Sequence, residues 1–99
     1  MLQDLTPASF EAQLGTVFHI HSGDAGPLGV KLHEVKRHER HPGPRSEPFS
    51  VYFLGALRPI LLQGIYRVEH AAMGTMEIFL VPVGPDPKGQ GMVYEAVFN

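Results

Sequence analysis

The stretch GIYRVEHAAMGTMEIFLVPV, residues 64–83, carries the clearest structural signal in the sequence. Residues 64–71 and 75–83 are rich in β-branched and aromatic side chains, which favour strands. Between them, Ala72-Met73-Gly74 has the length and the glycine of a tight turn. The pattern predicts an antiparallel hairpin, so the fold is expected to be built from strands.

The same period of two recurs on both sides of this hairpin. In residues 16–22, Phe18 and Ile20 alternate with side chains that fall on the opposite face, including two histidines. Further strands are predicted at residues 30–38, 48–55 and 92–98, and Gly/Pro-rich segments such as 23–27 are typical of the turns between them.

The order of these elements predicts a mainly β fold. Because no strand–helix–strand unit occurs, the sheet is expected to be antiparallel, with strands that are neighbours in sequence pairing as meanders. About six short strands around one small core favour a small β-barrel or a tightly bent sandwich, since closing the sheet protects its edges.

One short helix is predicted near the N-terminus, in the segment DLTPASFEAQLGT. Thr6 is a suitable N-cap, Pro7 suits the first helical position, and Gly15 is typical of a helix end. The helix should span about two turns and either plug one end of the barrel or cover an edge. Its buried stripe is predicted to consist of Leu5, Phe10 and Leu14.

Three segments lack periodicity. Residues 38–48, HERHPGPRSEP, contain three prolines and a glycine, and we expect them to form the most mobile surface loop. Residues 84–91 form a loop by composition. Residues 60–63 are apolar but follow Pro59, which favours a bend or an edge strand.

Length and charge limit the classes of function. The 99 residues fit a single domain spanning 1–99, and the formal net charge of −2 gives no reason to expect nucleic acid or an anionic membrane as partner. The absence of cysteine excludes disulfides, thiolate nucleophiles and Cys-based zinc sites. The N-terminal residues do not resemble a signal peptide, and no apolar run is long enough for a membrane helix, so a cytoplasmic location is expected.

His19 and His21 are candidate metal ligands because residues two apart on a strand lie on one face, about 6.5 Å apart. If the connection between the first two strands is symmetric, His19 falls opposite His33 and His21 opposite Lys31. His19, His21 and His33 could then bind zinc. The alternative is an ordinary solvated strand face, which Lys31 on the same face favours.

Other chemical motifs are incomplete. The string HEVKRH, residues 33–38, has one residue too many between its histidines to match the metalloprotease motif HExxH. Ser50 lacks the glycines of a nucleophile elbow. Glu69 and Glu77 are predicted to lie near one another on the outer face of the hairpin, where charge pairing explains them better than catalysis.

His70 follows the alternation of its strand and is predicted on the same face as Tyr66. We interpret His70 as a buried neutral histidine that hydrogen-bonds to a backbone group.

Five segments of the chain together resemble a family of small bacterial proteins of unknown function. These segments are EPFSVYFLG (47–55), LQGIYRVEH (62–70), Met73-Gly74, FLVPVGPD (79–86) and YEAVFN (94–99). The helical region 5–15 is similar as well. The resemblance implies no catalytic residue. It implies that the protein is an accessory product encoded near phage-tail-collar-like genes. The histidine-rich segment 33–41 does not belong to the shared pattern.

The resulting expectation is a non-enzymatic protein-interaction or assembly module without a cofactor, in a phage-tail-like or fibre-associated setting. It would bind a protein partner or a second copy by β-addition at the strand edges 48–55 or 92–99. One alternative is a metal-binding module or metal-dependent enzyme that uses His19, His21 and His33. Another is a small-ligand-binding barrel, although six strands of this length should fill their interior with side chains.

Overall fold

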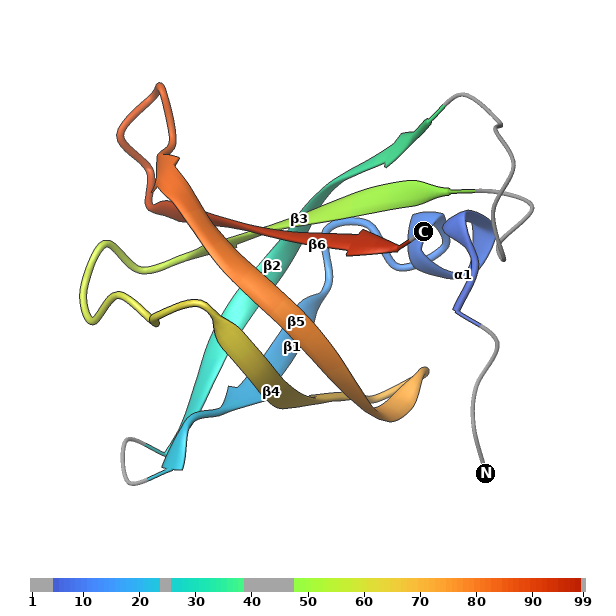
Figure 1. Cartoon of the computed structure of the whole chain (residues 1–99), viewed down its shortest axis with the longest axis horizontal. Helices are drawn as coiled ribbons and strands as arrows, with labels where there is room; N and C mark the ends of the chain where they lie inside the picture. Colours follow the sequence, from blue (N-terminus) through green and yellow to red (C-terminus); the bar gives the residue numbers. More distant parts are fainter. Residues whose placement is uncertain (1–4, 24–25, 39–47, 99) are drawn as a thin grey trace.

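Alternating burial along the chain produces six strands and one short helix (Figure 1). In this computed structural model, the residues described are 5–23, 26–38 and 48–98. In β1, Phe18 and Ile20 are fully buried and the residues between them are exposed, as the pattern predicts. The elements are α1 (Pro7–Glu11), β1 (Val17–His21), β2 (Pro27–Arg37), β3 (Phe49–Gly55), β4 (Gly64–His70), β5 (Gly74–Pro85) and β6 (Met92–Phe98).

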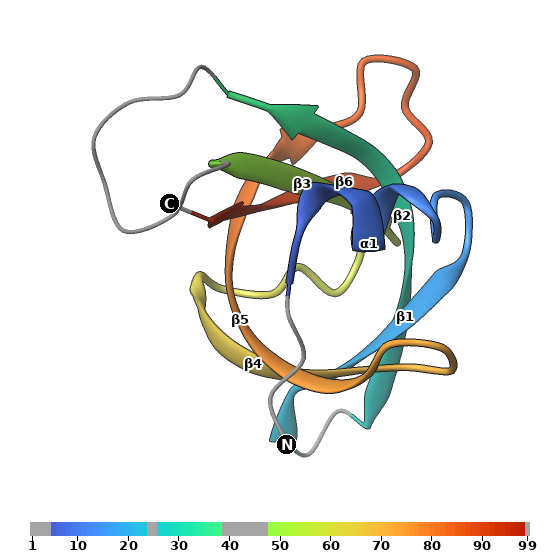
Figure 2. The same cartoon turned by 90° about the vertical axis from the view of Figure 1, so that its right-hand side faces the viewer.

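The strands close into an antiparallel barrel in the order β1-β2-β3-β6-β5-β4, with β4 pairing back to β1. Figure 2 looks along the barrel and shows the strands surrounding its core. The predicted meanders are confirmed within β1–β3 and within β4–β6. The prediction is wrong between β3 and β4, which do not pair. Residues 56–63 cross the barrel end between these two strands, and β6 occupies the place beside β3.

Closure removes the strand edges that were predicted as docking elements. β3 pairs with β2 on one side and with β6 along its whole length on the other. β6 pairs with β3 and, over Met92 to Glu95, with β5. Docking by β-addition at β3 or at Met92 to Glu95 is therefore contradicted, because the backbone groups of these residues already pair on both sides. Ala96 to Phe98 pair with β3 but not with β5.

The interior of the barrel is filled by apolar side chains, as expected for six short strands. All the strands contribute to it, and ring contacts such as Phe18 with Phe53, at 5.2 Å between centroids, join strands that are not paired with each other. The fully or nearly buried apolar strand residues are Phe18, Ile20, Val30, Leu32, Phe49, Val51, Phe53, Val68, Met76, Ile78, Leu80, Met92, Tyr94 and Ala96.

Two strands are longer than predicted. β2 begins at Pro27, three residues early, and Pro27 lies opposite His21 at the strand start, where a missing N–H is tolerated. β5 continues to Pro85 because a bulge between Pro82 and Gly84 restores its pairing with β6. Residues 24–25 of the predicted turn and 39–47 of the predicted mobile loop lie outside the described residues.

The helix is shorter than predicted, but it closes one end of the barrel, which was one of the two predicted positions. It spans five residues and ends at Glu11, and Gly15, at φ +85°, follows a further turn. Phe10 is fully buried among three rings, those of Phe18, Phe49 and Phe98, at centroid distances of 5.6–6.2 Å. Leu5 also packs on the core, whereas Leu14 is 46% exposed because the chain leaves the helix before reaching it.

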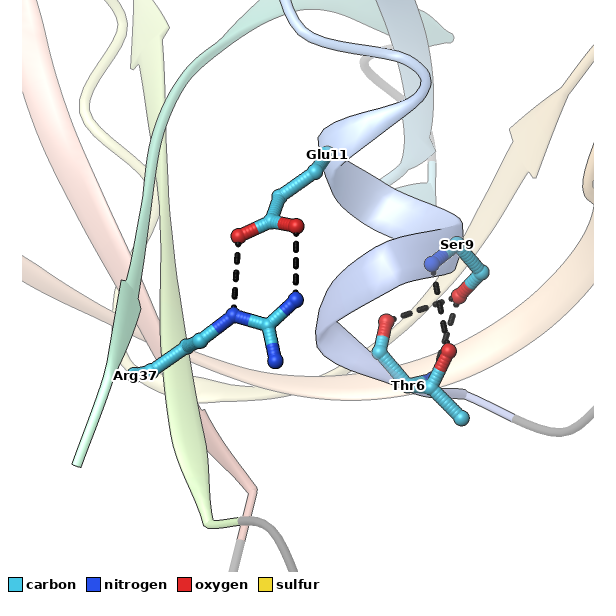
Figure 3. Close-up of polar contacts among 4 residues, drawn as sticks. All are labelled: Thr6, Ser9, Glu11 and Arg37. Carbon is cyan, nitrogen blue, oxygen red and sulfur yellow. Dashed lines mark hydrogen bonds and ion pairs between the residues drawn. The ribbon is translucent and has the colours of Figure 1, made fainter. Parts of the chain in front are cut away.

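Polar contacts anchor this plug at the near end of the barrel in Figure 2. The Thr6 hydroxyl accepts from the Ser9 N–H, and the Ser9 hydroxyl accepts from the Thr6 N–H, which forms a capping box (Figure 3). Arg37, at the end of β2, donates two hydrogen bonds to the Glu11 carboxylate. The hydrogen bond from Arg37 lowers the pKa of Glu11 below its ordinary value.

The opposite end of the barrel is covered by residues 56–63, of which 60–63 were predicted as a bend or an edge. It forms a bend without strand pairing. Leu61 is buried, and its N–H donates to the Tyr94 hydroxyl at 2.9 Å. In the part of the chain that the structure describes, no helix is long and apolar enough to cross a membrane.

Candidate functional site

The predicted histidine cluster is not brought together. His19 pairs with Gly29 and His21 pairs with Pro27, so the expected partners, His33 and Lys31, are wrong. The register differs because β2 begins at Pro27. Residues 22–26 connect the two strands, which is fewer residues than the predicted connection contained. His33 lies four residues further along β2, at the bulge between Leu32 and Glu34.

The outer wall formed by β1, β4 and β5 carries polar pairs, one of which includes a predicted histidine. His21 Nε2 donates to Glu69 Oε1 at 2.8 Å. This hydrogen bond lowers the pKa of the exposed Glu69 carboxyl. Glu69 lies opposite Thr75, and Glu77 lies opposite Arg67, so Glu77 faces a cation directly across the strand pair. Within residues 5–23, 26–38 and 48–98, no group of three or more His, Asp or Glu side chains is placed to bind a metal ion.

The string of residues 33–38 lies on β2 and just beyond it, not on a helix. A strand turns successive side chains to opposite faces, so the two-histidine geometry of a metalloprotease helix is absent here.

His70 is the histidine with the most defined environment, and its predicted role is confirmed. It is 8% exposed, and its Nδ1 accepts from the backbone N–H groups of Ala72 and Met73 at 3.0 and 3.2 Å. Because Nδ1 accepts, the proton of the neutral ring is on Nε2. Burial lowers the pKa of His70 below its ordinary value, which favours this neutral form.

The tautomer of His70 excludes a catalytic role toward its neighbour Thr16. The Thr16 hydroxyl lies 2.8 Å from His70 Nε2 and donates to the Gln13 carbonyl at 2.7 Å. Nε2–H therefore donates to Thr16, and no ring nitrogen is available to remove the Thr16 proton. The network joins the segment after α1 to the β4–β5 turn. Sequence reasoning missed Thr16 because 54 residues separate the two partners.

The stability of the protein should depend on pH through His70. Its pKa is lower in the folded than in the unfolded chain, so the unfolded chain binds more protons as the pH falls below about 6.5. We expect the free energy of unfolding to be fully retained above about pH 6.5, to decrease as the pH falls toward the folded-state pKa, and to level off below it.

Urea denaturation between about pH 4 and pH 8 checks this dependence. The variant His70→Gln should have a flatter profile than the wild type, whereas the control His33→Gln changes an exposed histidine and should retain the wild-type slope. Equal slopes for His70→Gln and the wild type would contradict the assignment.

A second polar chain lies on the outer face of β3 and its neighbours. His38 Nε2 and Ser50 Oγ are 2.7 Å apart, and the Tyr52 hydroxyl donates to Glu95 Oε2 at 2.8 Å. The hydrogen bond to the Glu95 carboxylate raises the pKa of Tyr52. Ser50 lies within a strand and is only 1% exposed.

An apolar row crosses the outer face of the last three strands, and it is defined as Ile65, Phe79 and Val97. Ile65 on β4 pairs with Phe79 on β5, and they are 71% and 50% exposed. Val97, on the neighbouring strand β6, points outward and is 50% exposed. Sequence analysis assigned these positions to strands but not to a shared surface, because the pairing of β4 with β5 and of β5 with β6 can be seen only in the structure.

Comparison with known proteins then identifies the family. A model described as "Domain of unknown function (DUF6916)" matches residues 5–98. The chain belongs to this family. The DUF6916 match includes the helix and all six strands, so the resemblance to a family of unknown function is confirmed. No curated protein and no solved structure matches the chain.

Proposed function

We propose that this domain is a non-enzymatic protein-interaction or assembly module that binds through the apolar row Ile65, Phe79 and Val97. The single observation that supports this is the direct pairing of two large, exposed apolar side chains, Ile65 and Phe79, across β4 and β5, with Val97 half exposed on the neighbouring strand β6. Clustered apolar side chains on a folded surface are typical of interaction sites, whereas isolated ones are not.

The surroundings of the row favour a protein as the occupant. Glu95 lies two residues before Val97 on β6, so both side chains are on the same face of the strand. The pair Arg67 and Glu77 lies two positions along the β4–β5 ladder from the pair Ile65 and Phe79. An apolar centre with a charged rim is the usual arrangement of protein interfaces. The partner would be a second copy or another protein that presents apolar side chains with polar neighbours. The cytoplasmic, phage-tail-like or fibre-associated setting remains part of the proposal and rests on the family resemblance and the composition.

The double variant Ile65→Thr, Phe79→Ser should lose binding, because both apolar contacts at the centre of the row are removed. Central apolar contacts each contribute about 2 kcal/mol or more, so the loss should be roughly 30-fold for one contact and on the order of 10³-fold for both. Analytical ultracentrifugation over a concentration series measures self-association, and capture assays with purified products of the neighbouring genes measure binding to a partner.

Val17→Thr is the matched control. Val17 is also outward-facing and half exposed, but it lies on β1, away from the row. This variant should bind like the wild type, and thermal unfolding should confirm that all variants are folded. The proposal is wrong if the wild type is monomeric and captures none of these proteins, or if the double variant binds as well as the control.

A further inference from the structure

A small cavity opens at the barrel end opposite α1, under residues 56–63. Its volume is about 180 Å³. For scale, an apolar cavity of about 150 Å³ in another protein holds a benzene molecule. The cavity therefore has room for one ring or a compact branched chain. Its apolar lining consists of Leu28, Val30, Pro59, Leu61 and the ring of Tyr94.

The cavity lies between the barrel core, which forms its floor, and residues 56–63, which cover it. Gly55 has no side chain, and a Cβ there would meet Val30 at 3.0 Å and the Tyr94 ring at 3.4 Å, so these two side chains fill the floor. The hydrogen bond from the Leu61 N–H to the Tyr94 hydroxyl fixes the covering segment.

Tyr94 also offers a hydrogen-bond donor to this cavity. The residue is 2% exposed, and its hydroxyl oxygen accepts from Leu61. Among the residues that the structure describes, no acceptor is present for the Tyr94 hydroxyl proton itself. A buried O–H without an acceptor is unfavourable, and an acceptor atom in the cavity would satisfy it.

Arg58 supplies a positive charge to the same cavity. Its side chain is exposed and lines the cavity, and it forms no ion pair with any carboxylate in the described part of the chain. None of the described lining residues is acidic. A guanidinium group binds carboxylates with two parallel hydrogen bonds, which a lysine does not do.

We propose that this cavity is a binding site for a small monocarboxylate with a compact apolar body, of about the size of benzoate. The apolar body occupies the space between Leu28, Val30 and Leu61, and the carboxylate accepts hydrogen bonds from Arg58 and from the Tyr94 hydroxyl. A strongly hydrated anion such as phosphate lacks the apolar body that this lining requires. The site is separate from the apolar row and does not depend on the proposed interaction function.

Titration with benzoate, followed by two-dimensional ¹H–¹⁵N NMR spectra, tests the site. We expect saturable shifts confined to residues around the cavity, such as Leu28, Gly29, Ala56 and Leu61, with a Kd on the order of 1 mM or lower for so small a ligand. Benzamide has the same ring without the charge, and it should bind at least about tenfold more weakly because it lacks the ion pair with Arg58.

Arg58→Gln provides the decisive variant, because this exposed residue can be changed without altering the core. We expect it to weaken benzoate binding by about tenfold and to leave benzamide binding unchanged. Arg67→Gln removes another exposed arginine, on the outer wall, and should leave both affinities unchanged.

The inference is overturned if benzoate causes no saturable shifts up to about 20 mM, a concentration well above the expected Kd. It is also overturned if benzoate and benzamide bind equally well, or if the shifts lie away from the cavity. The double variant Ile65→Thr, Phe79→Ser should bind benzoate like the wild type, which separates this site from the proposed interaction surface.

Discussion

Phe10→Ala is expected to lower the free energy of unfolding by about 3–5 kcal/mol, which is the usual cost of removing a buried phenylalanine. Phe10 is fully buried and is the residue through which α1 plugs the barrel. Alanine would leave a cavity between the rings of Phe18, Phe49 and Phe98, which belong to three different strands and cannot close around it. Urea denaturation followed by circular dichroism measures the loss.

A small domain has a total stability of only about 5–15 kcal/mol, so Phe10→Ala can unfold the protein completely. Phe10→Leu retains most of the apolar volume and should cost less than about 1.5 kcal/mol. Leu14→Ala, in the exposed turn after the helix, should change stability by less than about 0.5 kcal/mol. If Phe10→Ala were as stable as Leu14→Ala, the helix would not be the plug that the packing indicates.

Gly91→Ala is expected to destabilise the protein by at least about 2 kcal/mol through overpacking. Gly91 is buried where the chain enters β6 beside the end of β3. A Cβ at this position would lie 2.1 Å from the Gly55 carbonyl oxygen, which is a backbone atom and cannot rotate away. Relief requires the β3 and β6 ends to separate, which breaks the pairing of Gly55 with Met92.

Gly64→Ala is the matched control because the new Cβ meets only the Tyr66 ring, at an ordinary 3.9 Å. This substitution should be neutral or stabilising by up to about 1 kcal/mol, since alanine restricts the unfolded chain. Thermal unfolding of both variants gives the comparison. Equal melting temperatures for Gly91→Ala and the wild type would show that the two strand ends do not approach as closely as described.

The strands and their inward faces were predictable from sequence because their signal is local. Alternation in β1, the turn between β4 and β5, and the start of α1 at Thr6 and Pro7 each depend on residues a few positions apart. The extents of the elements were less predictable. The helix ends at Glu11, and a turn over residues 12–15 leads to Gly15, which the sequence had marked as the helix end.

The candidate sites were less predictable still, because they depend on strand register. A shift in the β1–β2 connection placed His19 opposite Gly29 and separated it from His33. The environment of His70 was predicted in part. Its backbone partners are two and three residues away, whereas its contact with Thr16 required β1 to pair with β4.

The sequence by itself determined that this chain forms short antiparallel strands with a helical plug, since hydrophobic period and turn residues act over a few positions. Only the tertiary structure decided that β3 pairs with β6 and not with β4, because closure of the barrel is a balance of contacts over the whole chain. This choice left β3 and the first half of β6 without a free edge. It also placed Arg58 and Tyr94 around one cavity.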